Sequence, residues 1–453
     1  MILPESLPAF KTFCRSVASL TSVVLLTRCV AGFLEHVGHM SASAAAGAIR
    51  TQACHRANIV RYLARLGVSR DWRMLEVLAE QLLQMESRHA GRWIFIVDQT
   101  YSGQSGAKTE NTFSRANYRP RPKKSGRKQK KWPRRSCQGF VMGLLITPSG
   151  FRIPSCRCYY TKAYSQAKGL TYRTQTEWAA ELIRQVPVPV GARAYVVGDT
   201  AFDAQCIRAA CAERGFFWVV PVNPERRLAG RPGRRRRVRS LVKDFTANNF
   251  AAYELQPGRG DGRVHRRLSR FRLGRKAKRR TYYVHGEQRN VHSVGKALLV
   301  FSTKEKPQAR QAVRVQKILW TNDTALSPAE VVDLYDRRWQ IELFFKELKS
   351  TLGFARHRFR QFAKVEGWAQ VCLVAFVYLE WRRGRALRQR ALSEPERRFW
   401  VSQRTYGGCQ AVRQHAEAHD LTQLDAWMRT ATGRRKLRQA LRLARPPEYR
   451  ASA

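Results

Sequence analysis

The chain has 453 residues, and its 84 lysines and arginines against 33 aspartates and glutamates give a formal net charge of +51. A hydrophobic fraction of 44% is that of a globular protein, so the charge decorates folded domains and does not mark a disordered tail. A chain this basic repels itself unless it meets a polyanion, of which nucleic acid is the common one and an acidic membrane surface the second.

Ten cysteines are spread along the chain without a framework spacing. Cys156 and Cys158 form the only close pair, and a single intervening residue falls short of a zinc signature. We therefore expect reduced, mostly buried thiols in a cytoplasmic, nucleoid-associated bacterial protein. Residues 17–34 are apolar but interrupted by polar side chains, which predicts a core helix and no membrane partner. No basic region precedes the first apolar stretch of the chain, so we expect no secretory signal.

Residues 1–90 are predicted to form a helical N-terminal domain. A helix over about 52–66, a C-cap at Gly67 and a second helix over about 72–86 have the outline of a helix-turn-helix. An ordinary helical bundle has the same outline. The charge of the whole chain gives DNA binding a modest preference.

Residues 91–222 are predicted to form the first part of an α/β core. The expected strands are 92–97, 139–147, 151–159, 193–197 and 216–220, and the expected helices are 174–185 and 203–214. A meander followed by alternating units indicates a mixed sheet with flanking helices. Asp98 and Asp199 each follow a buried strand, where such sheets place ligand sites. Each aspartate taken alone would be read as a turn or cap residue.

Two basic segments are expected to contact DNA. Residues 119–135 are predicted to form an exposed arm over phosphates, and a run of arginines near residue 235 is predicted to lie in a loop. The candidate DNA contacts are Lys123, Lys124, Arg127, Lys128, Lys130, Lys131, Arg234, Arg235, Arg236 and Arg237.

Residues 223–325 are predicted to be a β-rich insertion, an antiparallel module set into the core. Its expected strands are 263–272, 280–285, 296–302 and 313–320. Residues 326–390 return to the core as helices, and residues 391–453 form a basic helical tail.

The helix that begins at Ser327 carries the most informative pattern of the chain. Tyr335, Arg338, Glu342 and Lys349 fall within an arc of roughly 60° on one helical face. A neighbouring apolar stripe faces a core, and it consists of Leu334, Ile341, Phe344, Phe345, Leu348 and Leu352. Such a helix places an acid and several phosphate-binding groups at the rim of a site. An ordinary amphipathic helix with solvated edge charges is the alternative.

Asp98, Asp199 and Glu342 share one chemical logic. Carboxylates are hard oxygen ligands that bind divalent cations. Two metal ions about 3.5–4 Å apart can stabilise the attacking and leaving oxygens of an in-line phosphoryl displacement. That chemistry requires neither histidine nor cysteine.

The spacing of Tyr335, Arg338, Glu342 and Lys349 resembles the Tyr-Arg-Glu-Lys signature of the insertion-sequence-four group of DDE transposases. Residues 97–100 and 198–202 are similar to the segments around that family's two aspartates. The resemblance implies a ribonuclease-H-like fold with a β insertion before the glutamate. It also implies two Mg²⁺ ions, with Mn²⁺ as a substitute, held by the three acids. Tyr335, Arg338 and Lys349 would contact phosphates of the transposon end.

Some relatives stack a flipped base on a tryptophan in the last strand of the insertion. Trp320 lies in that region but a few residues late, so we expect no such role for it.

The expected function is cut-and-paste transposition on terminal inverted repeats and target DNA. Joining two ends predicts a homodimer in a synaptic complex. A nuclease or resolvase of the same fold and a non-catalytic DNA-binding descendant of a transposase are the alternatives. An RNA-associated basic protein would explain the charge but not the acids.

Overall fold

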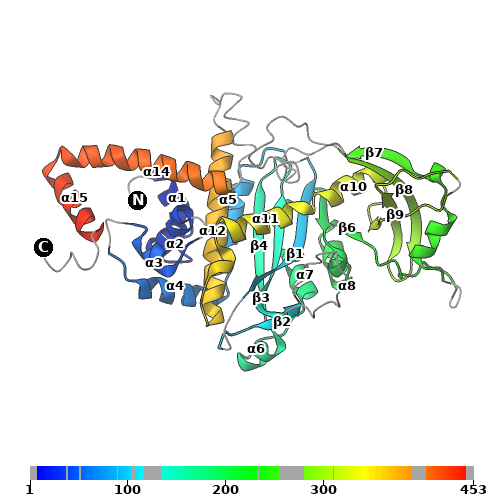
Figure 1. Ribbon diagram of the computed structural model, residues 1–453, viewed down its shortest axis with the longest axis horizontal. Helices are drawn as coiled ribbons and strands as arrows, with labels where there is room; N and C mark the ends of the chain where they lie inside the picture. The colour runs from blue at the N-terminus through cyan, green and yellow to red at the C-terminus, as the bar shows by residue number, and fades with distance from the viewer. Residues whose placement is uncertain are drawn as a thin grey trace, which may run out of the picture.

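The computed structural model describes residues 8–36, 39–49, 53–88, 90–103, 108–116, 134–231, 235–255, 280–309, 311–388 and 405–444. These residues form an elongated molecule, with the N-terminal helices at one end, a sheet in the middle and the strands of the insertion at the other end (Figure 1). The predicted strand at 263–272 and the predicted basic arm lie outside the described residues, apart from the arm's last two residues, which begin β3.

Ten strands of the described chain form one mixed sheet in the order β2-β3-β1-β5-β6-β10-β9-β8-β7, with β4 also paired to β3. The strands are β1 (Trp93–Gly103), β2 (Phe113–Ala116), β3 (Arg134–Ile146), β4 (Arg152–Tyr159), β5 (Ala194–Val197), β6 (Phe217–Pro221), β7 (Ala251–Leu255), β8 (Arg280–Val291), β9 (Gly295–Thr303) and β10 (Lys317–Thr321). β5 pairs in parallel with β1 and β6, and the remaining pairs are antiparallel. The predicted mixed α/β architecture is confirmed.

The strands of the insertion do not form a sheet of their own. β10 pairs antiparallel with β6, and β9, β8 and β7 follow it, so the inserted strands extend the core sheet. The reason is the edge of β6, whose backbone N–H and C=O groups would otherwise lack partners. The insertion is therefore continuous with the strands that carry the acids.

Helices cover both faces of this sheet. They are α1 (Pro8–Arg15), α2 (Val23–Glu35), α3 (Ala42–Gly47), α4 (Arg56–Ser69), α5 (Arg73–Leu83), α6 (Lys162–Ala167), α7 (Gln175–Gln185), α8 (Gln205–Glu213), α10 (Pro328–Asp336), α11 (Trp339–Ser350), α12 (Phe362–Leu387), α14 (Thr405–Met428) and α15 (Ala431–Ala444). Four short 3₁₀ segments are η1 (Thr200–Phe202), η2 (Val238–Asp244), η3 (Ala247–Asn249) and η4 (Phe354–Arg356).

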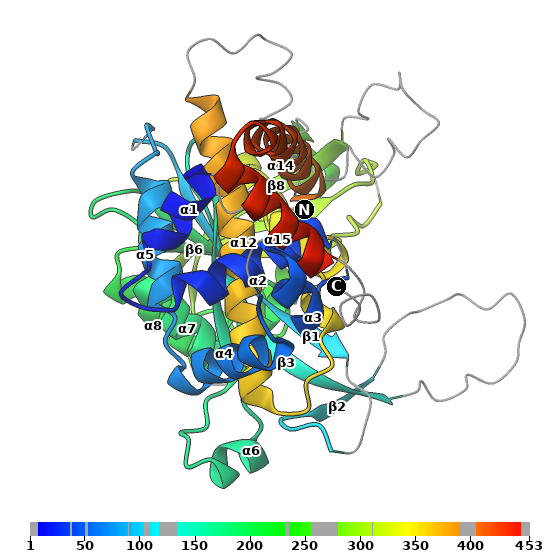
Figure 2. The same cartoon turned by 90° about the vertical axis from the view of Figure 1, so that its left-hand side faces the viewer.

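The N-terminal helices pack around α12 and share its core (Figure 2). Gly67 does not end the first predicted helix: α4 continues to Ser69, and Arg70 adopts the left-handed cap conformation with φ 49°. Gly67 instead permits close packing, because a Cβ there would lie 1.7 Å from the carbonyl oxygen of Ala363. A Cβ on Gly367 would lie 2.0 Å from the Leu63 carbonyl oxygen. The predicted boundary near residue 90 therefore does not separate two hydrophobic cores.

Of the described helices, only α12 is long and apolar enough to cross a membrane, and most of its side chains are buried inside the protein. It is the central core helix, wrapped by α2, α4 and α5 on one side and by β4 on the other. The predicted core helix near residues 17–34 is α2, with Leu26, Val30 and Leu34 buried.

The predicted signature helix is divided into α10 and α11 at Arg337 and Arg338. The N–H of Arg338 donates to the Tyr335 carbonyl at 3.0 Å, and the Ile341 N–H donates to the Arg338 carbonyl at 3.2 Å. These three-residue bonds tighten the chain between Tyr335 and Glu342. The predicted start is confirmed, since Ser327 and Glu330 form a capping box with Pro328 in the first turn. The predicted apolar stripe is buried throughout.

Candidate active site

The first two acids are brought together by the pairing of β1 with β5. Ile96 lies opposite Val197 in the parallel register. Asp98 lies two residues further along β1, and Asp199 lies two residues beyond the end of β5, so both aspartates come to the same edge of the sheet. The charge of Asp199 acts on Asp98 there. The sequence signal was the apolar strand before each aspartate; their adjacency follows from the register.

Asp98 is held in an environment that disfavours its charge. Burial raises the pKa of its carboxyl to about 6, against an ordinary value of 3.8. The Gln99 N–H donates to Asp98 Oδ1 at 2.7 Å and opposes that rise. The negative charges of Asp199 and Glu342 raise the pKa of Asp98 further. Three carboxylates thus act on one another at this edge of the sheet.

Asp199 also serves as a cap, as its sequence context allowed. Its Oδ1 accepts a hydrogen bond from the Ala201 N–H at 2.8 Å at the start of η1. The nearby Asp203 is committed elsewhere, in ion pairs with Arg208 at 2.5 Å and Arg226 at 2.7 Å. Asp199 is therefore the aspartate of this segment that faces the site.

Arg338 joins the third acid to the first. Its Nη2 lies 2.5 Å from Glu342 Oε1 and its Nη1 lies 3.4 Å from Asp98 Oδ2. One guanidinium therefore bridges a strand carboxylate and a helix carboxylate. Burial opposes the charge of Arg338, but Tyr335 and these acids raise its pKa.

These acids fit divalent metal ions by their chemistry. Within the described residues, no group of three histidine, cysteine, aspartate or glutamate side chains is arranged to hold a metal ion as it stands. Instead, the guanidinium of Arg338 supplies the positive charge between the carboxylates of Asp98 and Glu342. Asp98 and Glu342 contact this guanidinium, and Asp199 acts on Asp98 through its charge. Carboxylate oxygens are hard ligands of the kind that Mg²⁺ and Mn²⁺ prefer.

Tyr335 lies beside this cluster at the end of α10. The guanidinium carbon of Arg338 is 5.9 Å from the centre of its ring. Burial raises the pKa of the phenol, and Asp199 and Glu342 are among the charges that act on it. Lys317, at the start of β10, also contacts the ring and was missed by sequence reasoning.

Lys349 comes to the same region from the far end of α11. Burial lowers the pKa of its ammonium group, Arg115 lowers it further, and Asp98 opposes both. Arg115 of β2 stacks on the ring of Tyr101 with its guanidinium carbon 3.8 Å from the ring centre. Arg115 was not predicted, because a short strand after a polar stretch gave no signal for it.

The predicted arginine run is only partly available to DNA. Arg236 pairs with Asp244 at 2.6 Å and Arg237 pairs with Glu225 at 2.5 Å. Arg235 donates to the Gly230 carbonyl at 3.1 Å. Arg234 and the six predicted contacts between residues 123 and 131 lie outside the described residues.

Trp320 is fully buried in β10 and does not present a ring face to a base. Its ring lies 4.7 Å from that of Trp218, and the guanidinium of Arg226 covers it at 4.6 Å. Trp339 is half-buried at the start of α11.

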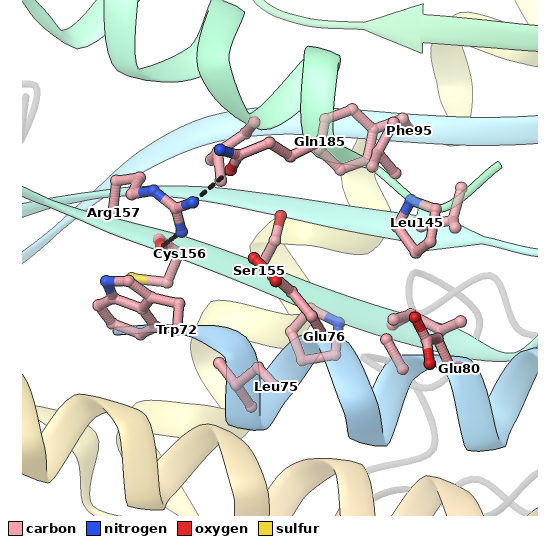
Figure 3. A pocket seen from close by; sticks show the side chains of 16 residues that line it. Trp72, Leu75, Glu76, Glu80, Phe95, Leu145, Ser155, Cys156, Arg157 and Gln185 are labelled. Carbon is pink, nitrogen blue, oxygen red and sulfur yellow. Dashed lines mark hydrogen bonds between the residues drawn. The ribbon is translucent and has the colours of Figure 1, made fainter. Parts of the chain in front are cut away.

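A cavity of about 290 Å³ lies away from the acids, between α5, β4 and the end of α7 (Figure 3). Phe95 and Leu182 line it, together with Trp72 and Ser155. Phe95 and Asp98 are three residues apart on β1, so their side chains point to opposite faces of the sheet. The candidate site and this cavity therefore lie on opposite faces of the sheet.

A comparison with known families decides the family. Residues 89–378 match the transposase DDE domain, a span that includes β1, the insertion, α11 and most of α12. The chain belongs to this family. Members of the DDE transposase family cut and transfer DNA and generally use divalent metal ions, and the mixed sheet agrees with their ribonuclease-H-like fold. A search of curated proteins found no match to the chain.

Proposed function

We propose that this DDE transposase belongs to the insertion-sequence-four group and performs cut-and-paste transposition. It would bind the terminal inverted repeats of its element, cleave the DNA there and join the freed ends to target DNA. The observation that carries the proposal is the bridge of Arg338 between Asp98 and Glu342, with Asp199 alongside.

In this proposal Asp98, Asp199 and Glu342 hold two Mg²⁺ ions. When bound, such a pair of ions supplies activation of the attacking oxygen and stabilisation of the leaving oxygen. With its two carboxylates engaged as metal ligands, the planar guanidinium of Arg338 would be available to bind a DNA phosphate. Tyr335 donates a hydrogen bond to a phosphate and Lys349 contributes a point charge.

We assign DNA binding outside the acidic site from the positions of positively charged side chains. α4 turns its buried residues Ile59 and Leu63 to α12. Its opposite side exposes Arg61 and Arg65. This basic face supports a DNA-binding role for the N-terminal helices, within the electrostatic footprint expected of a chain with net charge +51. Strand transfer needs two ends held together, which is our reason to propose a homodimer.

A strand-transfer assay tests the proposal. Purified protein is mixed with a duplex that carries the DNA flanking the reading frame, with a plasmid target and with Mg²⁺ or Mn²⁺. We expect 3′-hydroxyl ends and joined products. A second substrate, already nicked at the end, bypasses cleavage. Cleavage with no joined product from either substrate would identify a nuclease or resolvase, and metal-independent binding with no cleavage would identify a non-catalytic DNA-binding protein.

A further inference from the structure

Lys317 brings a cation from the insertion to the candidate active site. It is the first residue of β10, which pairs with β6 on one side and β9 on the other. Its Nζ lies 3.4 Å from the Tyr335 hydroxyl and 4.5 Å from the centre of the Tyr335 ring. Lys317 is exposed, and it is not one of the four signature residues.

The contacts of the Tyr335 hydroxyl determine where its hydrogen can go. Lys317 donates to the phenolic oxygen, and the side chain of Arg338 hydrogen-bonds to the same group. Ammonium and guanidinium groups only donate, so the phenolic oxygen accepts both bonds. Burial keeps the phenol protonated by raising its pKa. Its own hydrogen is therefore available for an acceptor outside this trio.

Two cations consequently flank one phenol, in unequal surroundings. Arg338 is engaged by Asp98 and Glu342 on the side of the acids. Lys317 lies on the solvent side, at the end of a strand. An acceptor that approached the Tyr335 hydrogen from solvent would meet the Lys317 ammonium first, and an anion would be favoured over a neutral group.

We propose that Lys317 and Tyr335 together bind one backbone phosphate of the DNA substrate, Lys317 through its charge and Tyr335 through its hydroxyl hydrogen. The inference rests on the proposed function, since it names a further DNA-binding residue of the same site. It also gives the insertion a direct part in holding the DNA strand at the acids.

Equilibrium DNA binding without divalent metal ions tests the inference, with a duplex that carries the flanking DNA. We expect Lys317→Ala to weaken binding roughly fivefold and to reduce the log–log salt slope by about 0.9, as for one lost phosphate contact. Lys317→Arg should restore both. Lys296→Ala is the matched control, because Lys296 is also exposed but lies at the opposite end of β9, about 20 Å away along the strand.

A double-mutant cycle with Tyr335→Phe separates shared from independent contacts. If both side chains hold one phosphate, Lys317→Ala should cost less in the Tyr335→Phe background than in the wild type. An unchanged affinity and slope for Lys317→Ala in a wild type that binds DNA would overturn the inference alone. A wild type that does not bind the duplex would overturn the proposed function as well. Equal losses for Lys317→Ala and Lys296→Ala would reduce both to general electrostatics and also refute a shared phosphate.

Discussion

Two glutamates of α11 each pair with an arginine, and the two pairs differ in how fully the surrounding negative charge is neutralised. Glu342 and Asp98 share Arg338 at the edge of the sheet. Five residues after Glu342, Glu347 shares Arg152 of β4 with Glu380 of α12. At about 100° per residue, the two glutamates point in directions roughly 140° apart on the helix.

The inner cluster consists of Arg152, Glu347, Glu380 and Arg383, and its positive and negative charges are equal in number. Arg152 lies 2.9 Å from Glu347 and 2.6 Å from Glu380, and Arg383 adds a second guanidinium 2.7 Å from Glu380. The Glu380 side chain is 3% exposed. Burial alone would raise the pKa of Glu380, but Arg152 and Arg383 lower it below its ordinary value. Two carboxylates meet two guanidinium groups, so this cluster fixes α11 and α12 to β4.

The outer cluster consists of Asp98, Asp199, Glu342 and Arg338, and its charges are not equal in number. Asp98 and Glu342 share the single guanidinium of Arg338, and the charge of Asp199 acts on Asp98. The Glu342 side chain is 32% exposed, and the pKa of Asp98 is raised to about 6. The same kind of pairing therefore fixes two helices to a strand in the inner cluster. In the outer cluster it leaves three carboxylates with the Arg338 guanidinium and the Lys349 ammonium, so that negative charge is in excess. An excess of this kind is what a cation-binding centre requires.

The largest expected effect is a loss of DNA cleavage in variants of the outer cluster. Glu342→Gln or Asp98→Asn should reduce metal-dependent DNA cleavage at least about a thousandfold, since each removes a charged oxygen from the proposed metal site. Gel assays of end cleavage measure this. Glu213→Gln, in an exposed ion pair with Arg184, is the control and should cleave as the wild type does. Cleavage near the wild-type rate in Glu342→Gln would remove Glu342 from the catalytic assignment.

The next effect concerns stability in the inner cluster. Arg152→Ala leaves Glu347 and Glu380 buried without their shared cation, and we expect a loss of about 3–5 kcal/mol in the free energy of unfolding. Urea denaturation followed by tryptophan fluorescence measures it. Arg184→Ala, at the surface, should cost less than about 1 kcal/mol. Comparable losses in the two variants would show that burial does not distinguish these pairs.

In metal-free protein, we expect a substitution in the outer cluster to raise the free energy of unfolding, whereas Arg152→Ala lowers it. Folding raises the pKa of Asp98 from 3.8 to about 6, so its protonated form is favoured in the folded state. Its contribution to stability is complete below pH 3.8 and is lost as the pH rises through 6. Asp98→Asn should therefore stabilise the protein by ~1–3 kcal/mol at pH 7.5 and by little at pH 4.

Glu380→Gln gives the contrasting profile in the same urea experiment. The pKa of Glu380 is lowered by folding, so its contribution is present above its unfolded value and is lost as the pH falls. The variant should be less stable than the wild type at pH 7.5, with the difference shrinking in acid. A destabilising effect of Asp98→Asn at pH 7.5 would show that folding does not raise the pKa of Asp98.

The smallest effect is stabilisation by metal ions. Mg²⁺ or Mn²⁺ at a tenfold excess over its dissociation constant should stabilise the folded protein by about 1.4 kcal/mol. Protons compete for Asp98, so the gain should shrink below pH 6. Thermal unfolding with and without metal measures the shift. Glu342→Gln should lose the response and Arg184→Ala should keep it; a response retained by Glu342→Gln would place the ion elsewhere.

The sequence was sufficient for the strands that end at Asp98 and Asp199 and for the apolar stripe of α11, because both depend on local periodicity. It was insufficient where partners are distant in the chain. Gly67 was predicted to end a helix, since glycine is common at that position. The actual reason for a glycine there is its close contact with Ala363, which lies on another helix. The pairing of β10 with β6 and the position of Lys317 beside Tyr335 likewise depend on tertiary contacts that no local pattern encodes. Hydrogen bonds at Arg338 divided a helix whose periodicity predicted continuity.

The contact between α4 and α12 has a practical consequence for anyone who wishes to produce the acid-bearing part alone. At Gly67 and Gly367 the two helices touch main chain to main chain, leaving no room for even a methyl group. A truncation that began near residue 90 would strip this partner away and expose the apolar flank of α12 to water. Such a fragment should aggregate, whereas a chain that starts ahead of α1 should stay in solution.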